Sequence, residues 1–357
     1  MAEISHTPRV VMVTGGAGFI GSNFVRHLLA ADPAVRVINY DALTYAGTLA
    51  NLEGVDEQYA SRYRFIQADI CDADAVRGVM TDENVDTLVH LAAESHVDRS
   101  IAEPGAFLQT NVMGTYNLLE AAREVWKGRD DVRFHHVGTD EVYGSLEPEG
   151  YFTEETPYNP SSPYSASKAA SDHLVSAWAR TYGVPATLSL CSNNYGPYQF
   201  PEKLLPLMMC NALLETPLPV YGDGKNVRDW LHVEDHCRAL DLIVRRGEPG
   251  RSYNIGGNNE WRNIDVVELL CDLLQKARPP KQVKHYRELI TFVPDRPGHD
   301  RRYAIDAERI RSELGWTPAW QFEDGLAQTL RWYLDNQHWL DRISREKYDG
   351  RRLGLLG

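Results

Sequence analysis

The sequence predicts an α/β protein built on a doubly wound parallel sheet, with a smaller α/β lobe toward the C-terminus. Short apolar runs alternate with amphipathic helical patterns from Val10 to about residue 190, which is typical of parallel βα units. A glycine-rich turn joins the first apolar run to the first helical pattern. Beyond residue 190, prolines, glycines and short mixed elements replace the alternation. We therefore expect residues 1–190 to form one domain and residues 191–357 mainly a second lobe, with some crossing of the chain between them.

Composition limits the class of protein. The chain has 357 residues, which suits two domains, and 43% of them are hydrophobic, which is enough for a sizeable core. A formal net charge of −13 argues against nucleic acid or an anionic membrane as the main partner. The five cysteines are widely spaced, as free thiols in a reducing compartment are. The sequence shows no secretion signal and no apolar run of about 18 residues, so we expect a soluble cytoplasmic protein.

The first strand and the turn after it carry a dinucleotide-binding pattern. Val10–Val13 is a short apolar run of the kind buried on both faces of a parallel sheet, and Thr14–Gly21 follows directly. Glycines permit a tight turn and let the backbone approach a pyrophosphate at the amino end of the helix Ser22–Ala30. A glycine pattern alone is weak, but its place between a strand and a helix favours a Rossmann-type domain. The residues of this turn predicted to bind the cofactor are Gly15, Gly18, Phe19, Ile20 and Gly21.

The second strand, Val35–Tyr40, ends at Asp41, 20 residues after Gly21. A carboxylate there can accept hydrogen bonds from the adenosine ribose and would repel a 2′-phosphate, so NAD is favoured over NADP. The alternative is that Asp41 is an ordinary turn residue. Leu43 and Thr44 follow and are also expected beside the cofactor.

Two further strands are expected to approach the cofactor. Tyr63–Ala68 leads to residues beside adenine, and Val85–Leu91 opens into small residues that let a cofactor lie close. His96 and Asp98 come next, but no cluster of ligands accompanies them and no metal is expected. The predicted cofactor residues from these segments and from the following helix are Asp69, Ile70, Leu91, Ala92, Ala93, Ser95 and Thr110. The helices expected here are Asp72–Met80, Ala106–Trp126 and Tyr164–Tyr182.

Thr139, Asp140 and Glu141 follow the strand Val132–Val137. They should lie at the carboxyl end of the sheet, where open α/β sheets bind ligands. Consecutive residues of a strand point to opposite faces, so both carboxylates can reach one ligand only if the strand ends or bends here. Gly138 permits such a bend. The alternative is an ordinary turn at the end of a strand.

Tyr164 and Lys168 lie four residues apart, just after the helix start Ser161–Pro163, and share one face of the helix. A nearby ammonium lowers the pKa of a tyrosine, so the two side chains can form a proton-abstracting pair. The alternative is a solvated helix face, because this spacing occurs by chance in many helices. The pair and the acidic run together, behind a dinucleotide-binding start, favour a catalytic site.

The second lobe is expected to follow a sixth parallel strand, Val184–Leu190. Its expected elements are a helix over Pro201–Leu214, strands over Leu218–Tyr221 and Ser252–Ile255, and helices over Ile264–Ala277 and Glu323–Asn336.

Several stretches together resemble one family. They are TGGAGFIGS, LAAESHVDRS, TDEVYG, SSPYSASKAASDHL, SNNYGPYQFPEKLLPL, RDWLHVEDH, YNIGGNNE and DRPGHDRRYAID. From about residue 9 to 335 the chain is similar to the extended short-chain dehydrogenase/reductase superfamily and, within it, to the dTDP-glucose 4,6-dehydratases. The specific part is TDEVYG, whose Asp-Glu pair the epimerases of the superfamily lack. Gly138, where the family usually has Ser, and the short connection Ser145–Phe152 are departures.

The resemblance implies an NAD-dependent hydro-lyase. Tyr164, with Thr139 on the same oxygen, would take the C4 hydroxyl proton while hydride passes to NAD, and Lys168 would hold the cofactor ribose. Glu141 would remove the C5 proton and Asp140 would protonate the departing C6 hydroxyl, before hydride returns to C6. NAD would therefore be regenerated and stay bound. Asn194 is a further cofactor residue implied by the resemblance.

The resemblance also implies substrate contacts and a homodimer. Arg228 and Arg296 are the candidates for the diphosphate, because a guanidinium matches phosphate geometry, although either can be a surface charge. The substrate-binding residues it implies are Ser95, Thr139, Asp140, Glu141, Asn193, Lys203, Leu204, Pro219, Tyr221, Arg228, Asn263, Arg296 and His299. The two long helices, 106–126 and 164–182, would form the dimer contact.

Three alternatives stay open at this point. The first is another nucleotide-sugar 4,6-dehydratase, with a UDP-, CDP- or GDP-linked substrate. The second is a 4-epimerase or decarboxylase on the same scaffold, which would not need Asp140 and Glu141. The third is a non-catalytic NAD-sensing protein, which is disfavoured because every catalytic group is present.

Overall fold

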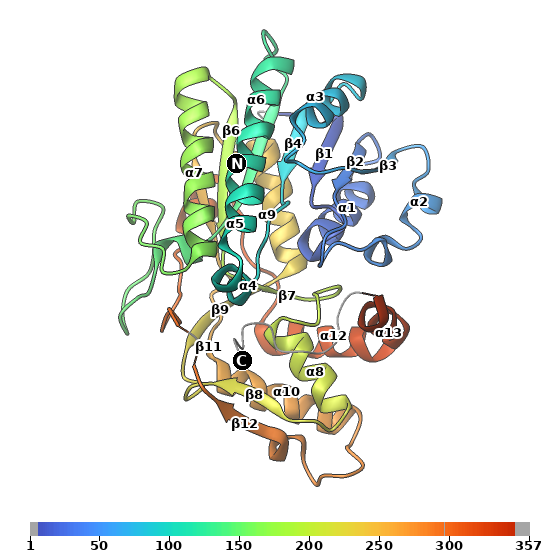
Figure 1. Ribbon diagram of the computed structural model, residues 1–357, viewed down its shortest axis with the longest axis vertical. Coiled ribbons are helices and arrows are strands. Elements are labelled where there is room, and N and C mark those ends of the chain that lie inside the picture. Colours follow the sequence, from blue (N-terminus) through green and yellow to red (C-terminus); the bar gives the residue numbers. More distant parts are fainter. Residues whose placement is uncertain (1–5, 296, 347–357) are drawn as a thin grey trace.

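The larger part of the molecule is a seven-stranded, all-parallel sheet in the order β10-β6-β5-β4-β1-β2-β3. The computed structural model describes residues 6–295 and 297–346. Figure 1 shows this sheet above a smaller lobe. Its strands are β1 (Val10–Thr14), β2 (Arg36–Asp41), β3 (Tyr63–Gln67), β4 (Thr87–His90), β5 (Arg133–Thr139), β6 (Ala186–Cys191) and β10 (Ser252–Ile255). The predicted doubly wound α/β fold is confirmed.

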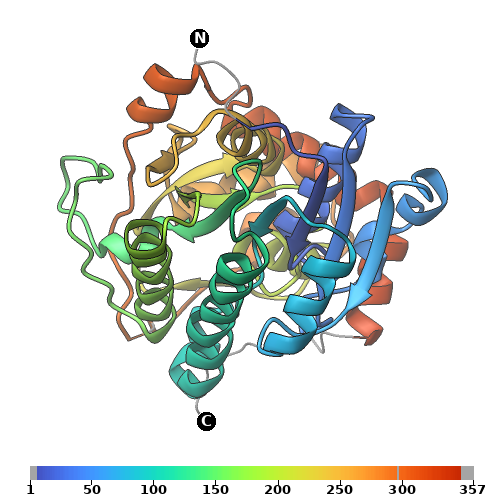
Figure 2. The same cartoon turned by 90° about the horizontal axis from the view of Figure 1, so that it is seen from above.

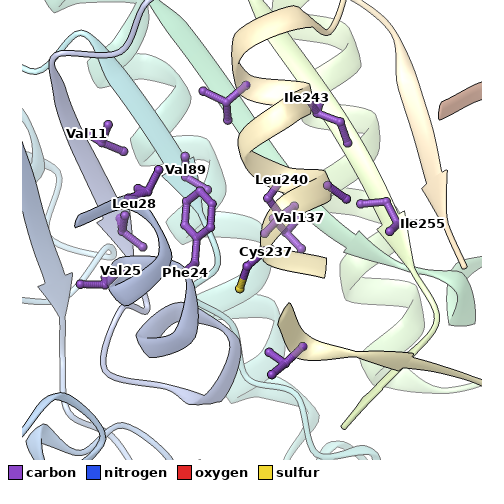
Figure 3. Packing of buried hydrophobic residues seen from close by; sticks show 14 of the residues in the cluster. Val11, Phe24, Val25, Leu28, Val89, Val137, Cys237, Leu240, Ile243 and Ile255 are labelled. Carbon is purple, nitrogen blue, oxygen red and sulfur yellow. The ribbon is translucent and has the colours of Figure 1, made fainter. Parts of the chain in front are cut away.

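Helices cover both faces of the sheet, as Figure 2 shows from above. One face carries α1 (Phe19–Ala31), α9 (Val233–Arg246) and α11 (Glu308–Leu314), and the other carries α3 (Ala73–Asp82), α6 (Thr115–Val125) and α7 (Pro163–Tyr182). The pleat of β1 sends Val11 and Val13 to the first face and Met12 to the second. Figure 3 shows the first core, where Leu28 of α1 and Leu240 of α9 pack over Val89. Apolar residues on both faces explain why these strands read as continuous hydrophobic runs.

The strand β10 corrects one expectation. Ser252–Ile255 was assigned to the second lobe, but it pairs in parallel with β6, with Ser252 opposite Leu188 and Ile255 opposite Cys191. Tyr253 and Ile255 are buried in the core that α1 and α9 share. The sequence of a four-residue strand can indicate an extended conformation, but it does not indicate which sheet edge the strand joins. The edge of β6 supplies the unpaired backbone groups that select this place.

Among the residues described, the lobe contains two small sheets and four α-helices around its own core. The strands are β7 (Asn193–Tyr195), β8 (Leu218–Tyr221), β9 (Val227–His232), β11 (Glu260–Arg262) and β12 (Ile290–Val293), and the helices are α8 (Leu204–Leu213), α10 (Asn263–Ala277), α12 (Phe322–Asp335) and α13 (Gln337–Glu346). The chain passes from β6 into this lobe, returns to the large sheet for α9 and β10, and returns again for α11. Within the residues described, no helix has the length and apolarity needed to cross a membrane.

The expected long helix Ala106–Trp126 is interrupted. It consists of α5 (Pro104–Phe107), a π-helical turn over Leu108–Gly114, and α6. Gly114 ends this turn, and a Cβ there would lie only 2.4 Å from Cδ1 of Ile70. The turn therefore lets the helix approach the residues after β3, and π-turns of this kind often occur at functional sites. The other short helices are α2 (Val55–Gln58) and α4 (Val97–Ala102).

Candidate active site

A cavity of about 320 Å³ lies at the carboxyl ends of the strands of the large sheet. Its walls come from the turn after β1, the ends of β2 to β6, the start of α7, and the segment Gln199–Lys203 of the lobe. This is where doubly wound sheets bind ligands. The cavity therefore lies between the two parts of the molecule, beside both predicted groups of residues.

The turn after β1 can accept a dinucleotide. Gly15 has a φ of +71°, and a Cβ there would lie 2.6 Å from the Ala92 nitrogen. A Cβ at Gly21 would lie 2.1 Å from the Gly15 oxygen. Only glycine fits at these two places, so the turn brings the amino end of α1 close against the sheet. The helix starts after Gly18, where no side chain caps its first N–H groups, and these groups suit the phosphates of NAD.

Asp41, the last residue of β2, is held rigidly at the wall of the cavity. Its Oδ2 accepts a hydrogen bond from the Ala17 nitrogen at 2.9 Å, and its Oδ1 accepts one from the Leu43 nitrogen at 2.8 Å. Asp41 lines the cavity, whereas Leu43 does not and packs instead against the core next to α1. The expected contact of Leu43 with the cofactor therefore has no support in the geometry.

The other residues predicted to bind the cofactor all line the cavity. They are Gly15, Gly18, Phe19, Ile20, Gly21, Asp41, Thr44, Asp69, Ile70, Leu91, Ala92, Ala93, Ser95, Thr110, Tyr164, Lys168 and Asn194. They come from seven segments that the sheet topology brings together, and Thr110 enters from the π-helical turn. The residues that line this cavity therefore fit the NAD that the sequence implied.

Asp140 and Glu141 reach the same cavity because the strand β5 ends at Thr139, just before them. Thr139 is the last residue of β5, and Asp140 opens a 3₁₀ turn over Asp140–Tyr143. The Thr139 hydroxyl accepts a hydrogen bond from the Glu141 nitrogen at 3.4 Å and donates one to Asp140 Oδ1 at 3.5 Å. Asp140 and Glu141 both line the cavity. Leaving the extended conformation removes the alternation that would have turned them apart.

Asp140 is poised to carry a proton. Only 1% of its surface is exposed. Burial raises the pKa of Asp140 well above its usual value, and the neighbouring charges of Glu141 and Asp229 raise it further, against the opposing effects of Arg228 and Thr139. Burial and neighbouring negative charge both favour the protonated form of this carboxyl, the form that can act as an acid.

Tyr164 and Lys168 lie one turn apart at the start of α7, and both line the cavity. A capping box of Ser162 and Ser165 fixes the first turn of this helix. Lys168 Nζ donates a hydrogen bond to the Val137 oxygen at 2.9 Å.

The expected direction of the tyrosine pKa is wrong for the protein by itself. Burial raises the pKa of Tyr164 well above its usual value, Glu141 adds to this effect, and Thr139 opposes it. Burial lowers the pKa of Lys168. The lysine is thus not the dominant influence on the phenol, because desolvation of a buried group outweighs it. The positive nicotinamide ring of bound NAD is the remaining charge that can favour the phenolate.

The residues predicted for the substrate divide into two groups. Ser95, Asn193 and Lys203 line the cavity together with Thr139, Asp140 and Glu141. Those not brought to its wall are Leu204, Pro219, Tyr221, Arg228, Asn263 and His299, while Arg296 lies outside the described residues. Arg228 is buried, with its guanidinium 4.3 Å from the ring centre of Tyr303 and hydrogen bonds to the carbonyls of Val227 and Asp300. Tyr221 donates a hydrogen bond to Asp98 at 2.9 Å.

One small group at the wall of the cavity was not predicted from the sequence. Tyr45 donates a hydrogen bond to Glu202 Oε1 at 3.1 Å, and its ring packs edge-on against Phe200. All three line the cavity. Phe200 and Glu202 belong to the stretch SNNYGPYQFPEKLLPL, which carried the resemblance, but nothing in the sequence paired them with Tyr45. Across residues 6–295 and 297–346, no three His, Cys, Asp or Glu side chains are grouped as a metal site requires.

Comparison with known proteins agrees with this geometry. A family model described as GDP-mannose 4,6 dehydratase matches residues 12–329. The dTDP-glucose 4,6-dehydratase of Neisseria meningitidis serogroup B is 55% identical over 354 residues, covering 97% of this chain and 99% of that protein. The chain belongs to the dTDP-glucose 4,6-dehydratase family.

Solved structures of a dehydratase and of an epimerase resemble this chain to different degrees. The crystal structure of a dTDP-glucose 4,6-dehydratase from Streptomyces venezuelae, with NAD and TYD bound, is 47% identical and superposes with a TM-score of 0.86, covering 94% of this chain and 99% of that one. A UDP-glucose 4-epimerase from Thermotoga maritima, with UDP-glucose, shares the fold at 27% identity and a TM-score of 0.80, covering 92% and 99%. The dehydratases are thus the nearer of these two groups in sequence.

Proposed function

We propose that this enzyme converts dTDP-glucose to dTDP-4-keto-6-deoxyglucose and water. The observation that carries the proposal is that Tyr164, Lys168, Asp140 and Glu141 share one cavity with a glycine turn built for a dinucleotide. Bound NAD would supply the redox chemistry, taking a hydride from C4 of the sugar and returning it to C6, so that no net oxidation occurs.

The first task of the protein is to remove the C4 hydroxyl proton. Tyr164 would take this proton, and Thr139 would donate a hydrogen bond to the same sugar oxygen. Lys168 has one N–H on the Val137 oxygen, and its place at the cavity wall leaves it able to hold the ribose hydroxyls of the cofactor. These residues act together, because the lysine fixes the cofactor against which the tyrosine must be aligned.

The second task is to expel water across C5 and C6. A ketone at C4 makes the C5 proton acidic, and Glu141 would remove it. The C6 hydroxyl would then leave with the proton of Asp140, whose protonated form is favoured because burial raises the pKa of that carboxyl. The buried Asp140 thus serves as acid and the less buried Glu141 as base.

A 4-epimerase is the second candidate, because that chemistry also uses a tyrosine and NAD. It would have no need for a protonated carboxyl beside a second carboxylate. The burial of Asp140 next to Glu141 carries an electrostatic cost, and an acid–base role explains it. Among the dehydratases, the choice of nucleotide is proposed from the 55% identity to a dTDP-glucose enzyme.

One assay series tests this proposal. The enzyme is incubated with dTDP-, UDP-, CDP- and GDP-glucose, and the 4-keto product is followed by its absorbance in alkali. We expect the 4-keto-6-deoxy product from dTDP-glucose, with a kcat/KM at least about tenfold above the other donors, the discrimination that one lost base contact produces. Formation of a 4-epimer without a 4-keto product would contradict the proposal, and a clear preference for another donor would correct the nucleotide.

We also propose a homodimer that works in the cytoplasm. All five cysteines are free, as in a reducing compartment.

The surface proposed for the dimer contact is apolar. Leu108, Met113 and Tyr116 expose apolar surface along the π-turn and α6, and Tyr182 does so at the end of α7. A patch of this kind marks an interaction surface. Light scattering after gel filtration should give twice the chain mass of 40.4 kDa. Leu108→Glu with Met113→Glu should give the single mass, and an unchanged dimer would move the interface elsewhere.

A further inference from the structure

A buried polar chain continues from the active-site lysine into the protein. Lys168 and Asp172 lie one turn apart on the same face of α7, and His136 of β5 lies between them. His136 Nε2 is 3.4 Å from Lys168 Nζ and 3.1 Å from Asp172 Oδ1. The exposed fractions of Lys168, His136 and Asp172 are 4%, 0% and 1%. Of the three, only Lys168 lines the cavity.

An ammonium buried to this degree needs a negative partner. The Val137 oxygen gives Lys168 a dipole but no charge. Burial lowers the pKa of Lys168, and the charge of Asp172 is the main influence that raises it again. His136 cannot supply that charge, because burial and the neighbouring lysine lower its pKa well below the usual value and keep it neutral. The carboxylate of Asp172, on the far side of His136, therefore favours the positive charge of Lys168.

The other groups around Asp172 support an ionised carboxylate. Tyr158 and Tyr143 face it from the segment before α7, and His173 is its neighbour on the helix. Burial raises the pKa of Asp172 to about 7, and Lys168, Tyr158 and His173 act against that rise. Asp172 thus carries negative charge on the alkaline side of neutrality. The Nε2 of a neutral His136 accepts a hydrogen bond from Lys168 Nζ, so Asp172 acts on the lysine by its charge and not through a shared proton.

Gly138 makes room for this carboxylate. A Cβ on Gly138 would lie 3.1 Å from Asp172 Oδ1 and 3.1 Å from the Ser189 oxygen. The residue just before Thr139 thus lacks a side chain at the place where Asp172 packs against β5.

We propose that Asp172 is a positioning residue for Lys168: from behind His136, its carboxylate holds the lysine ammonium charged and in place at the cavity wall. The inference deepens the proposed function and rests on it. Lys168 touches the cavity, whereas Asp172 acts only through its neighbours.

The test is Asp172→Asn, which keeps the shape and removes the charge. Because the carboxylate raises the pKa of Lys168, its loss should let the lysine lose its proton at lower pH. We expect the alkaline limb of kcat to move to lower pH by about one unit, so that activity on that limb falls about tenfold. NAD retained after gel filtration should also fall at about pH 9 while it is kept at about pH 7. A stable variant with the wild-type limb and wild-type NAD retention would overturn the proposal.

A second pair of variants covers the case in which Asp172→Asn does not fold. Glu at position 172 keeps the negative charge, whereas Gln, of the same size, removes it. We expect Asp172→Glu to keep the alkaline limb and Asp172→Gln to move it to lower pH. Identical limbs in these two variants would overturn the proposal.

A matched control separates position from general stability. Asp235 is equally buried, with 1% exposure, but its Oδ2 accepts hydrogen bonds from the nitrogens of Ala319 and Trp320, away from the cavity. Asp235→Asn should lower the melting temperature and leave the alkaline limb unchanged.

The proposed function and the positioning role fail on different results. Failure of the wild-type enzyme to convert dTDP-glucose would contradict the proposed function. Loss of NAD at high pH from Asp172→Asn would still support the positioning role.

Discussion

Glu141→Gln and Asp140→Asn enzymes, mixed with dTDP-glucose, are expected to oxidise the sugar at C4 and then stop. Each change keeps the size of the side chain and removes one of the two groups that expel water. Turnover should fall about 100-fold or more, the usual contribution of a positioned acid or base. Because Tyr164 remains, the reduced cofactor should accumulate on the enzyme, and its absorbance in a stopped-flow or single-turnover experiment provides the measurement.

A control for this pair is Glu154→Gln. Glu154 is a largely buried carboxylate outside the cavity, and its Oε1 accepts a hydrogen bond from the Asn254 nitrogen at 2.8 Å. The Glu154→Gln enzyme should retain turnover and accumulate no reduced cofactor. Normal product formation by both Glu141→Gln and Asp140→Asn would remove these residues from the mechanism.

Tyr164→Phe is expected to stop the reaction one step earlier. The ring should stay packed edge-on against Phe107, at 6.3 Å between centres, so only the hydroxyl is lost. Without it, the C4 hydroxyl keeps its proton, and turnover should fall about 100- to 10,000-fold with no accumulation of reduced cofactor. The same absorbance measurement therefore distinguishes this variant from the two carboxylate variants.

The matched control is Tyr143→Phe. This tyrosine is also buried, and its hydroxyl donates a hydrogen bond to Asn254 Oδ1 at 3.0 Å, outside the cavity. The variant should lose some stability and keep its turnover. If Tyr164→Phe formed reduced cofactor as fast as wild type, another group would have to be the proton acceptor.

The sequence predicted the fold well where one physical signal dominated. Strands buried on both faces often read as apolar runs, so β1, β2 and β4 were found close to their true limits. The glycines at 15 and 21 were found because their turn admits no other residue. The proposed catalytic pair was predicted from local spacing, since Tyr164 and Lys168 need only one helical turn to lie on the same face.

Other features depend on contacts between distant segments. The residues of Ser252–Ile255 do not indicate that this strand pairs with β6. The residues around Asp172 in the sequence do not indicate its contact with His136. For the protein without cofactor, burial raises the pKa of Tyr164 against the expected direction, because the sequence shows the neighbouring charge but not the depth of burial. The group formed by Tyr45 and Glu202 joins residues more than 150 positions apart, which no local pattern reports.

The repeated passage of the chain between the two parts has a practical consequence. A fragment ending at residue 190 would lose β10 and α9, uncovering one edge of β6 and apolar side chains such as Val89 and Val137. Such a truncated half should misfold or aggregate rather than serve as a free-standing NAD module. Exchange of the sugar half with that of a relative would likewise require three separate grafts, around β7 to β9, β11 to β12, and α12 to α13, because these stretches are interleaved with the sheet along the chain.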